Sequence, residues 1–219
     1  CDLIFQMGTA KYGLRNEAGR LDEDKLKALE GRDLVKMIEI KLSQGAKPGK
    51  GGILPGIKVD EVIASTRGIP VGADSISPNR HAEVKSISDL LDFIKYVRDC
   101  SGKPTGIKCV IGQTQWLDEF CQRIVHQGLE FAPDFITVDS GDGGTGAAPL
   151  SLMDHTGLPV KRSLPIVVDK LMEYGLRERI RIIASGRLVN PADVAAALCL
   201  GADCVNSARG FMFALGCIQ

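Results

Sequence analysis

The sequence predicts an α/β fold, a parallel (β/α)8 barrel of the TIM type that is incomplete in this chain. Short runs rich in β-branched residues alternate with helical patterns, which is typical of a parallel sheet. Glycine and polar residues follow strand after strand, where barrel enzymes place their sites, and no G-x-G-x-x-G follows a first strand. Only five or six strands can be counted, whereas a closed barrel has eight in about 250 residues. We therefore expect the first strands to be missing.

The strands and helices follow from hydrophobic periodicity and from start and stop signals. Apolar residues at 90, 91, 93, 94 and 97 form one helical face, which Ser86 or Ser88 caps. Asn190 and Pro191 begin the last helix and Gly201 ends it. The expected strands are 2–6, 37–42, 107–111, 135–139, 180–184 and 204–206, and the expected helices are 59–64 (short), 89–97, 115–127, 164–174 and 191–200.

Bulk composition excludes several classes of function. The chain has 27 Lys and Arg against 27 Asp and Glu, so nothing in its charge predicts binding to nucleic acid or to an anionic membrane surface. No apolar stretch approaches the roughly 20 residues that cross a bilayer. Seven scattered cysteines without a C-x-x-C pair indicate a reduced, cytoplasmic protein. We interpret residues 1–219 as the C-terminal part of a single domain, cut from a longer polypeptide.

A long segment, residues 45–81, does not fit a simple barrel connection. It contains four prolines and many glycines. An insertion of this length after a strand usually serves as a lid or a binding loop, and a solvated loop is the alternative.

Two glycine-rich features follow strands and predict a cofactor site. Residues 140–149 contain four glycines, which let the backbone approach a ligand closely. Ser185-Gly186-Arg187 and Ser207-Ala208-Arg209 follow the last two strands, and two such turns on adjacent strands can bind one phosphate. Arg187 and Arg209 either add charge there or are ordinary surface residues.

Lysines provide the remaining candidates. Lys108 is an isolated cation within an apolar strand; a buried lysine is costly unless it is paired. It either stabilises negative charge on a bound cofactor or extends its ammonium to solvent at a strand edge. Residues 39–52 carry three lysines at a strand end, which suits an anionic substrate. There Lys47 binds a carboxylate, or the segment is a solvated basic loop.

Taken together, these residues resemble the FMN-binding synthase domain of glutamate synthase and the FMN-binding glutamate synthase family. The resemblance runs from about Gln6 to Gln219. Its most specific stretches are residues 37–49, 141–147 and 214–218.

The resemblance implies a (β/α)8 barrel with FMN at its C-terminal mouth. The implied flavin ligands are Gln6, Thr9, Lys11, Lys108, Ser140, Gly143, Gly144, Thr145 and Gly146, and the implied phosphate ligands are Ser185, Gly186, Arg187, Ser207, Ala208 and Arg209. Lys41, Gln44 and Lys47 would bind the substrate, and Lys47 and Lys108 would act in catalysis. The implied reaction reduces the imine of 2-oxoglutarate and ammonia to glutamate. The flavin carries the electrons.

The chain departs from the family pattern at two positions. Ile53 stands where the large synthases have a glutamine thought to contact the keto acid, which could change the substrate. Cys217 matches the first of three cysteines that hold an iron-sulfur cluster, and the other two are not in this sequence. Implied partners are a glutaminase domain, which is not found in this chain, and an electron donor.

Two other functions stay open at this point. Another FMN barrel, such as a hydroxy-acid oxidase or a type 2 isopentenyl diphosphate isomerase, usually uses a catalytic histidine. Only His81, His126 and His155 are available, with His126 inside a helix and His155 in a loop. The other possibility is a subunit or fragment without activity of its own.

Overall fold

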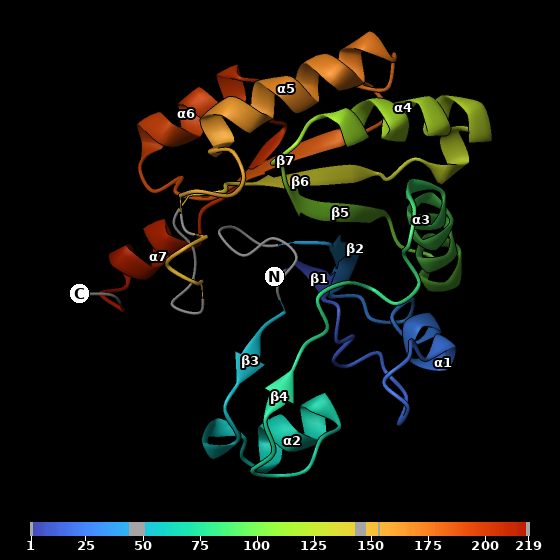
Figure 1. Cartoon of the computed structure of the whole chain (residues 1–219), viewed down its shortest axis with the longest axis vertical. Helices are drawn as coiled ribbons and strands as arrows, with labels where there is room; N and C mark the ends of the chain where they lie inside the picture. The colour runs from blue at the N-terminus through green and yellow to red at the C-terminus, as the bar shows by residue number, and fades with distance from the viewer. Residues whose placement is uncertain (1, 44–50, 143–147, 153, 218–219) are drawn as a thin grey trace. The chain divides into compact units, whose positions relative to one another are not determined.

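The computed structural model describes residues 2–43, 51–142, 148–152 and 154–217 (Figure 1). The chain divides into two compact units. The first unit contains Cys1–Leu42 and Gly49–Gly106, and the second contains Ser43–Pro48 and Ile107–Gln219. Each unit is described by itself below.

Two parallel strands form the sheet of the first unit. Strand β1 (Leu3–Met7) pairs with β2 (Val35–Lys41), and Gln6 lies opposite Glu39. The connection contains a short helix, α1 (Glu23–Lys27), which begins at the Asp22 cap. The strands predicted at 2–6 and 37–42 are thus confirmed within two residues. Helix α1 was not predicted, because a segment of five residues is too short to show a helical period.

The long segment of the first unit has secondary structure of its own. Strands β3 (Ile53–Leu54) and β4 (Ser75–Ile76) pair antiparallel. Between them lie a 3-10 turn, η1 (Gly56–Lys58), and helix α2 (Glu61–Arg67). The predicted short helix at 59–64 therefore starts later, after the Asp60 cap. The hairpin was not predicted, because two-residue strands are too short to show an alternation of apolar and polar residues.

Tyr12 fastens this segment to the loop that follows β1. Its hydroxyl lies 2.5 Å from Ser75 Oγ, and Arg67 Nη1 donates to the same Ser75 oxygen at 2.8 Å. The guanidinium groups of Arg15 and Arg67 lie 5.3 and 4.8 Å from the centre of the Tyr12 ring. Arg15 also donates to the Gly68 carbonyl at 2.9 Å. The segment is therefore held by cation–π contacts as well as by hydrogen bonds.

Helix α3 (Ile87–Ser101) completes the first unit, and its start is fixed by a capping box. Asp89 N donates to Ser86 Oγ at 3.1 Å, and Ser86 N donates to Asp89 Oδ2 at 3.0 Å. Of the two predicted caps, Ser86 and Ser88, the structure selects Ser86. The helix buries the predicted apolar face, which comprises Leu90, Leu91, Phe93, Ile94 and Val97.

Loss of this cap is expected to destabilise the protein measurably. Ser86→Ala leaves the Asp89 amide without its acceptor, so we expect the free energy of unfolding to fall by about 1 kcal/mol. Urea unfolding measures the change. Ser65→Ala in α2 is the matched control, because the Ser65 hydroxyl only donates back to Val62 within its own helix. Equal losses in the two variants would contradict the capping role.

Four parallel strands form the sheet of the second unit. Strand β5 (Thr105–Val110) enters this unit at Ile107 and pairs with β6 (Phe135–Asp139). Strand β6 pairs with β7 (Arg181–Ser185), which pairs with β8 (Cys204–Asn206). All five residues of β6 are buried, as expected for a parallel sheet covered on its faces.

Helices connect these strands and cover one face of the sheet (Figure 1). These helices are α4 (Gln115–Gln127), α5 (Val160–Glu173) and α6 (Pro191–Cys199). A 3-10 turn, η2 (Leu129–Phe131), follows α4, and a separate helix, α7 (Ala208–Ala214), follows β8. Phe120 and Ile124 of α4 and Leu164 and Val167 of α5 are buried. Strands and helices thus confirm the predicted class, an incomplete parallel (β/α) barrel.

Most of the predicted bounds hold in the second unit. Helix α4 and strands β6 and β8 have the predicted ends, and Asn190 caps α6 by accepting from Asp193 N at 2.9 Å. Helix α5 begins at Val160, four residues earlier than predicted, and so contains Pro165 in its interior. Among the described residues no helix is both long and apolar enough to cross a bilayer.

Candidate functional site

In the second unit the turns that follow three neighbouring strands lie side by side. Asp139 of β6 is in register with Ser185 of β7, and Ser185 is in register with Asn206 of β8. Because the strands are parallel, their carboxyl ends meet at one edge. The amide of Ser140 donates to the Ser185 carbonyl at 2.9 Å, which joins the first two turns directly.

Gly186 allows the closest approach between these turns. Its φ is +103°, a conformation that side chains rarely adopt. A Cβ at this position would lie 2.9 Å from Ser140 N and closer still to Ser140 Cβ. The next residue, Arg187, also has a positive φ, of +53°. Any side chain at position 186 would therefore strain the turn after β7.

The turn after β8 is bonded to the turn after β7. Ser207 Oγ donates to the Leu188 carbonyl at 2.5 Å. A Cβ on Gly210 would lie 2.6 Å from that Ser207 oxygen and 2.8 Å from the Val189 carbonyl oxygen. The structure thus brings together the two predicted segments, Ser185–Arg187 and Ser207–Arg209.

A small cavity of about 240 Å³ lies beside the first of these turns. Its lining residues are Asp142, Pro159, Val160, Lys161, Gly186, Arg187, Leu188 and Asp193. Arg187 lies 3.5 Å from Asp142, and Lys161 lies 3.1 Å from Asp193. The hydrogen bond from Lys161 holds the pKa of Asp193 below its ordinary value.

A phosphate monoester fits the chemistry of this set of donors. Proteins commonly bind such a group with the backbone N–H groups of turns that follow parallel strands, together with a nearby guanidinium or ammonium. Arg187 is half-exposed, so its side chain can exchange Asp142 for a phosphate oxygen.

Ser140 has a structural role that the sequence did not reveal. Its hydroxyl accepts a hydrogen bond from Val160 N at 2.9 Å, at the first turn of α5, and donates to the Asp142 carboxylate. Gly141 N donates to the Leu158 carbonyl at 2.8 Å. Ser140 therefore fixes where the glycine-rich run begins. Of that run, the predicted ligands Gly143, Gly144, Thr145 and Gly146 lie outside the described residues.

Lys108 is paired, as a cation within an apolar strand should be. Its ammonium lies 3.5 Å from Asp139 Oδ2, and the two side chains are 14% and 10% exposed. Lys108 is in register with Thr137, so Asp139 projects from the same face of the sheet two residues further on. Sequence reasoning missed Asp139 as a partner, although its position after four apolar or β-branched residues was a usable signal. The predicted substrate ligands Gln44 and Lys47 lie outside the described residues.

In the first unit the predicted flavin residue Gln6 bonds to a buried carboxylate. Gln6 Nε2 donates to Glu39 Oε1 at 2.5 Å, and Glu39 is only 4% exposed. A glutamate in the middle of an apolar strand signals such a site, although Glu39 was not predicted as part of one. The third predicted substrate ligand, Lys41, ends the same strand.

Thr9 and Lys11 lie in the loop that follows β1. Thr9 Oγ1 donates to the Pro78 carbonyl at 2.7 Å. Lys11 is buried, and its ammonium lies 2.9 Å from Glu83 Oε2. The backbone of Lys11 has a φ of +52°. Glu83 was not predicted, and no sequence signal distinguishes it from a surface glutamate.

His81 is the one buried histidine of the described residues and lies close to these groups in the same unit. Its Nε2 lies 3.0 Å from the carbonyl oxygen of Lys41. Because a carbonyl only accepts, Nε2 carries the proton, and Nδ1 is buried without a hydrogen-bond partner in the described part of the chain. Burial lowers the pKa of His81; the Lys41 carbonyl opposes this shift and the Lys11 charge reinforces it.

Stability is therefore expected to depend on His81 at acid pH. The folded state keeps this ring neutral, whereas the unfolded chain takes up a proton below the ordinary pKa of 6.5. The free energy of unfolding should decrease as pH falls from 6.5 toward the folded-state pKa, by at most about 1.4 kcal/mol per pH unit from this group. Urea unfolding at a series of pH values measures the slope. His81→Gln should flatten it, and an unchanged slope would contradict the assignment.

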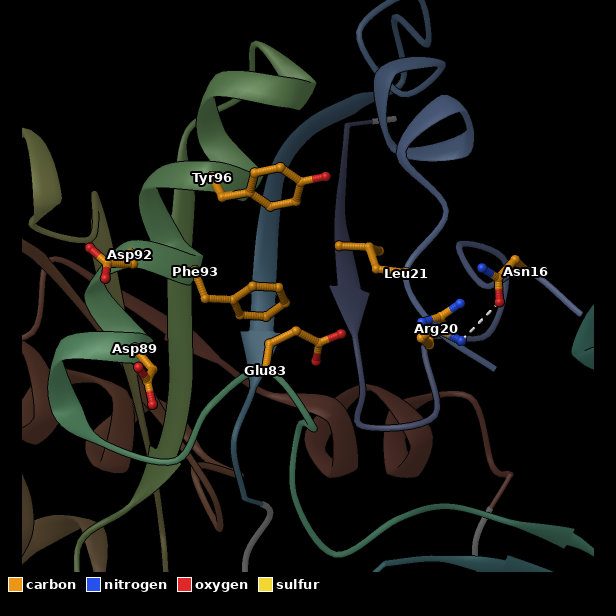
Figure 2. A pocket seen from close by; sticks show the side chains of 8 residues that line it. All are labelled: Asn16, Arg20, Leu21, Glu83, Asp89, Asp92, Phe93 and Tyr96. Atoms are coloured by element: carbon orange, nitrogen blue, oxygen red, sulfur yellow. Dashed lines mark hydrogen bonds between the residues drawn. The ribbon is translucent and has the colours of Figure 1, made fainter. Parts of the chain in front are cut away.

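A wider hollow of about 640 Å³ opens in the first unit (Figure 2). Its lining residues are Asn16, Arg20, Leu21, Glu83, Asp89, Asp92, Phe93 and Tyr96. Three are carboxylates, and Figure 2 shows Glu83 reaching into the hollow beside Phe93. No residue predicted for the site is among these lining residues.

Four further residues singled out in the sequence have plain surroundings. Cys217 is exposed and follows α7, and the described residues contain no cluster of three metal-ligating side chains. Ile53 is 58% exposed on β3. His126 lies within α4, and His155 N bonds to the Leu152 carbonyl. The structure brings neither His126 nor His155 into the sites described above.

Comparison with known proteins gives a match over nearly the whole chain. The family model described as "Conserved region in glutamate synthase" matches residues 2–219. The glutamate synthase large subunit-like protein YerD of Bacillus subtilis (strain 168) is 44% identical over 218 residues, covering 100% of this chain and 41% of the relative. The archaeal glutamate synthase [NADPH] of Methanocaldococcus jannaschii is 41% identical over 189 residues, covering 82% and 34%. The chain thus spans less than half the length of these relatives.

Solved structures confirm the fold. A mutant flavocytochrome b2 with pyruvate bound superposes with a TM-score of 0.58 at 18% identity, covering 100% of this chain and 45% of that one. A second flavocytochrome b2 structure, with sulfite bound, gives the same TM-score at 17% identity.

Proposed function

We propose a function from one premise, that the chain belongs to the glutamate synthase family. The proposed function is that of an FMN-dependent oxidoreductase which reduces the imine of 2-oxoglutarate and ammonia to glutamate. The relatives named glutamate synthase support it. FMN, when bound, supplies the hydride. The residues of this chain bind and orient the two molecules.

One observation carries the proposal, the joined pair of turns after β7 and β8. Gly186 and Arg187 belong to the first turn, and the hydroxyl of Ser207 bonds the second turn to it. We propose that Ser185, Gly186 and Arg187, with Ser207, Ala208 and Arg209, hold the FMN phosphate. Ser140 and the glycine run after it would then support the ring.

The remaining roles follow the family resemblance. Lys108, paired with Asp139, would place positive charge beside the ring, and Gln6, Thr9 and Lys11 would line it. Lys41, Gln44 and Lys47 would bind the carboxylates of the substrate, and Lys47 would also orient the imine. A positive charge held in a site that excludes water stabilises developing negative charge far better than the same group in solvent.

The proposed reaction also needs ammonia and electrons. We propose that ammonia comes from a glutaminase domain or subunit and that electrons come from a donor domain or subunit. The name of the relative from Methanocaldococcus jannaschii includes NADPH. An iron-sulfur cluster with Cys217 as one ligand would relay those electrons. The free cysteines of the described residues are consistent with the cytoplasm as its location.

FMN binding and turnover test the proposed function. The purified protein should be yellow, release FMN on denaturation, and form glutamate from 2-oxoglutarate and ammonia with a reduced electron donor. A correctly folded protein that takes up no FMN would rule the function out. Arg187→Ala should weaken FMN binding more than riboflavin binding, because riboflavin lacks the phosphate.

A different 2-oxo acid is the second candidate, and Ile53 favours it. An apolar side chain at this position cannot donate the hydrogen bond that the glutamine of the large synthases would give. Comparing 2-oxoglutarate with oxo acids that have apolar side chains, in the wild type and in Ile53→Gln, distinguishes the two. The variant should gain activity on 2-oxoglutarate if Ile53 changes the substrate.

A further inference from the structure

One turn of the first unit, residues 81–84, contacts two segments that are distant from it in sequence. The turn is closed by a hydrogen bond from Val84 N to the His81 carbonyl at 3.2 Å. Its Glu83 side chain lies 2.9 Å from the Lys11 ammonium, and its His81 ring lies 3.0 Å from the Lys41 carbonyl oxygen. Lys11 and Lys41 are 30 positions apart and have different roles in the proposed function.

The Glu83 carboxylate compensates the buried positive charge of Lys11. The side chain of Lys11 is only 3% exposed, and a buried ammonium is costly unless an opposite charge compensates it. Its backbone is held in the left-handed conformation by hydrogen bonds at both sides, from Lys11 N to Gly8 O and from Leu14 N to Lys11 O. The pairing with Glu83 therefore fixes the position of the Lys11 side chain, which the backbone hydrogen bonds leave undetermined.

Lys41 depends on His81 for the position of its backbone. His81 is 2% exposed, and its ring packs against Phe93 with the ring centres 5.7 Å apart. Such a ring has little freedom to turn, and its Nε2–H is directed at the carbonyl of the last residue of β2. The hydrogen bond holds the strand end from which the Lys41 side chain projects.

We propose that Glu83 and His81 are positioning residues, which rests on the roles given to Lys11 and Lys41 in the proposed function. Glu83 holds the Lys11 ammonium in position for flavin binding, and His81 holds the end of β2 in position for substrate binding. Because each acts through a different lysine, removing one should change one binding constant and spare the other. A turn that merely supported the fold would change both constants together.

Glu83→Gln tests the flavin side, because it removes the charge and keeps the size of the side chain. We expect the dissociation constant of FMN to rise at least about tenfold, the equivalent of one pKa unit of lost charge compensation, while KM for 2-oxoglutarate stays within about twofold. Glu23→Gln is the control, since Glu23 pairs with Lys27 at an exposed position on α1. If Glu83→Gln does not fold, Lys11→Met/Glu83→Gln removes both charges, and wild-type FMN affinity in that double variant would overturn the proposal.

His81→Leu tests the substrate side. We expect KM for 2-oxoglutarate to rise at least about tenfold, as for the loss of one hydrogen bond, with the FMN dissociation constant within about twofold. His81→Gln keeps an N–H donor and should restore most of the affinity. A parallel change of both constants in either single variant, or no change in either constant, would overturn the inference.

Peptide-resolved hydrogen exchange separates this inference from the proposed function. If the wild-type protein binds no FMN, the proposed function fails, and exchange alone then decides the inference. Glu83→Gln should then speed exchange in residues 8–14, and His81→Leu should speed it in residues 38–42, each sparing the other segment. Exchange that increases in both segments in each variant would reject the two separate positioning roles.

Discussion

Replacing Lys108 by methionine is expected to lower kcat for glutamate formation by about 10²- to 10³-fold, the effect of removing one preorganised electrostatic group from an active site. Lys108 lies in a buried strand and is 14% exposed, with Asp139 as its ion-pair partner at 3.5 Å. Within the proposed function its ammonium stabilises negative charge on the reduced ring. Lys108→Arg keeps the charge and should retain more activity than Lys108→Met.

Two controls separate this effect from damage to the fold. Lys108→Met/Asp139→Asn also removes the charge of the carboxylate, so it should recover stability but not kcat. Lys170→Met is the matched variant in the same unit, since Lys170 pairs with Asp118 at 2.7 Å on the helical layer, and it should leave kcat unchanged. Wild-type kcat in folded Lys108→Met, or recovery of kcat in the double variant, would rule out a role of Lys108 in the reaction.

The second large effect is expected at Gly186. Gly186→Ala combines a positive φ with a clash against Ser140, and we expect the free energy of unfolding to fall by about 2–5 kcal/mol, from left-handed strain and overpacking together. FMN affinity should fall at least about 100-fold if the turn holds the phosphate, because a shift of about 1 Å in a positioned group has effects of that size. Urea unfolding and FMN titration measure the two effects.

Gly175→Ala is a suitable control for backbone strain alone. Gly175 also has a positive φ, of +67°, but nothing lies within 4 Å of a Cβ built there. It should therefore cost only about 1–2 kcal/mol and leave FMN affinity unchanged. Similar losses of stability in the two alanine variants would show that the contact with Ser140 is unimportant.

Hydrophobic periodicity was sufficient to predict the elements that bury a continuous face. The strand at 135–139 and the helix at 115–127 were predicted with their true ends, because each has a clear apolar pattern and a glycine or polar boundary. The β3–β4 hairpin and α1 escaped prediction, since two to five residues cannot show a period. Helix α5 was predicted too short because its first amide is satisfied by the distant Ser140 hydroxyl, a tertiary contact.

The candidate site was only partly accessible to the same reasoning. Glycine and serine after successive strands predicted the turns at 185–187 and 207–209, because strand order places such turns together. The partners of the charged residues could not be predicted. Asp139 for Lys108, Glu39 for Gln6 and Glu83 for Lys11 are defined by register and side-chain direction. Those features exist only in the folded chain.

The contacts of Tyr12 with Arg15 and Arg67 have a consequence for protein engineering. Two guanidinium groups, one aromatic ring and the Ser75 hydroxyl make this attachment, and no carboxylate or histidine takes part in the contacts described. A shortened version that deletes the hairpin with α2 would remove Arg67 and Ser75 together and leave the ring and hydroxyl of Tyr12 to solvent. Trimming the protein to a minimal scaffold therefore requires redesign of residue 12 as well.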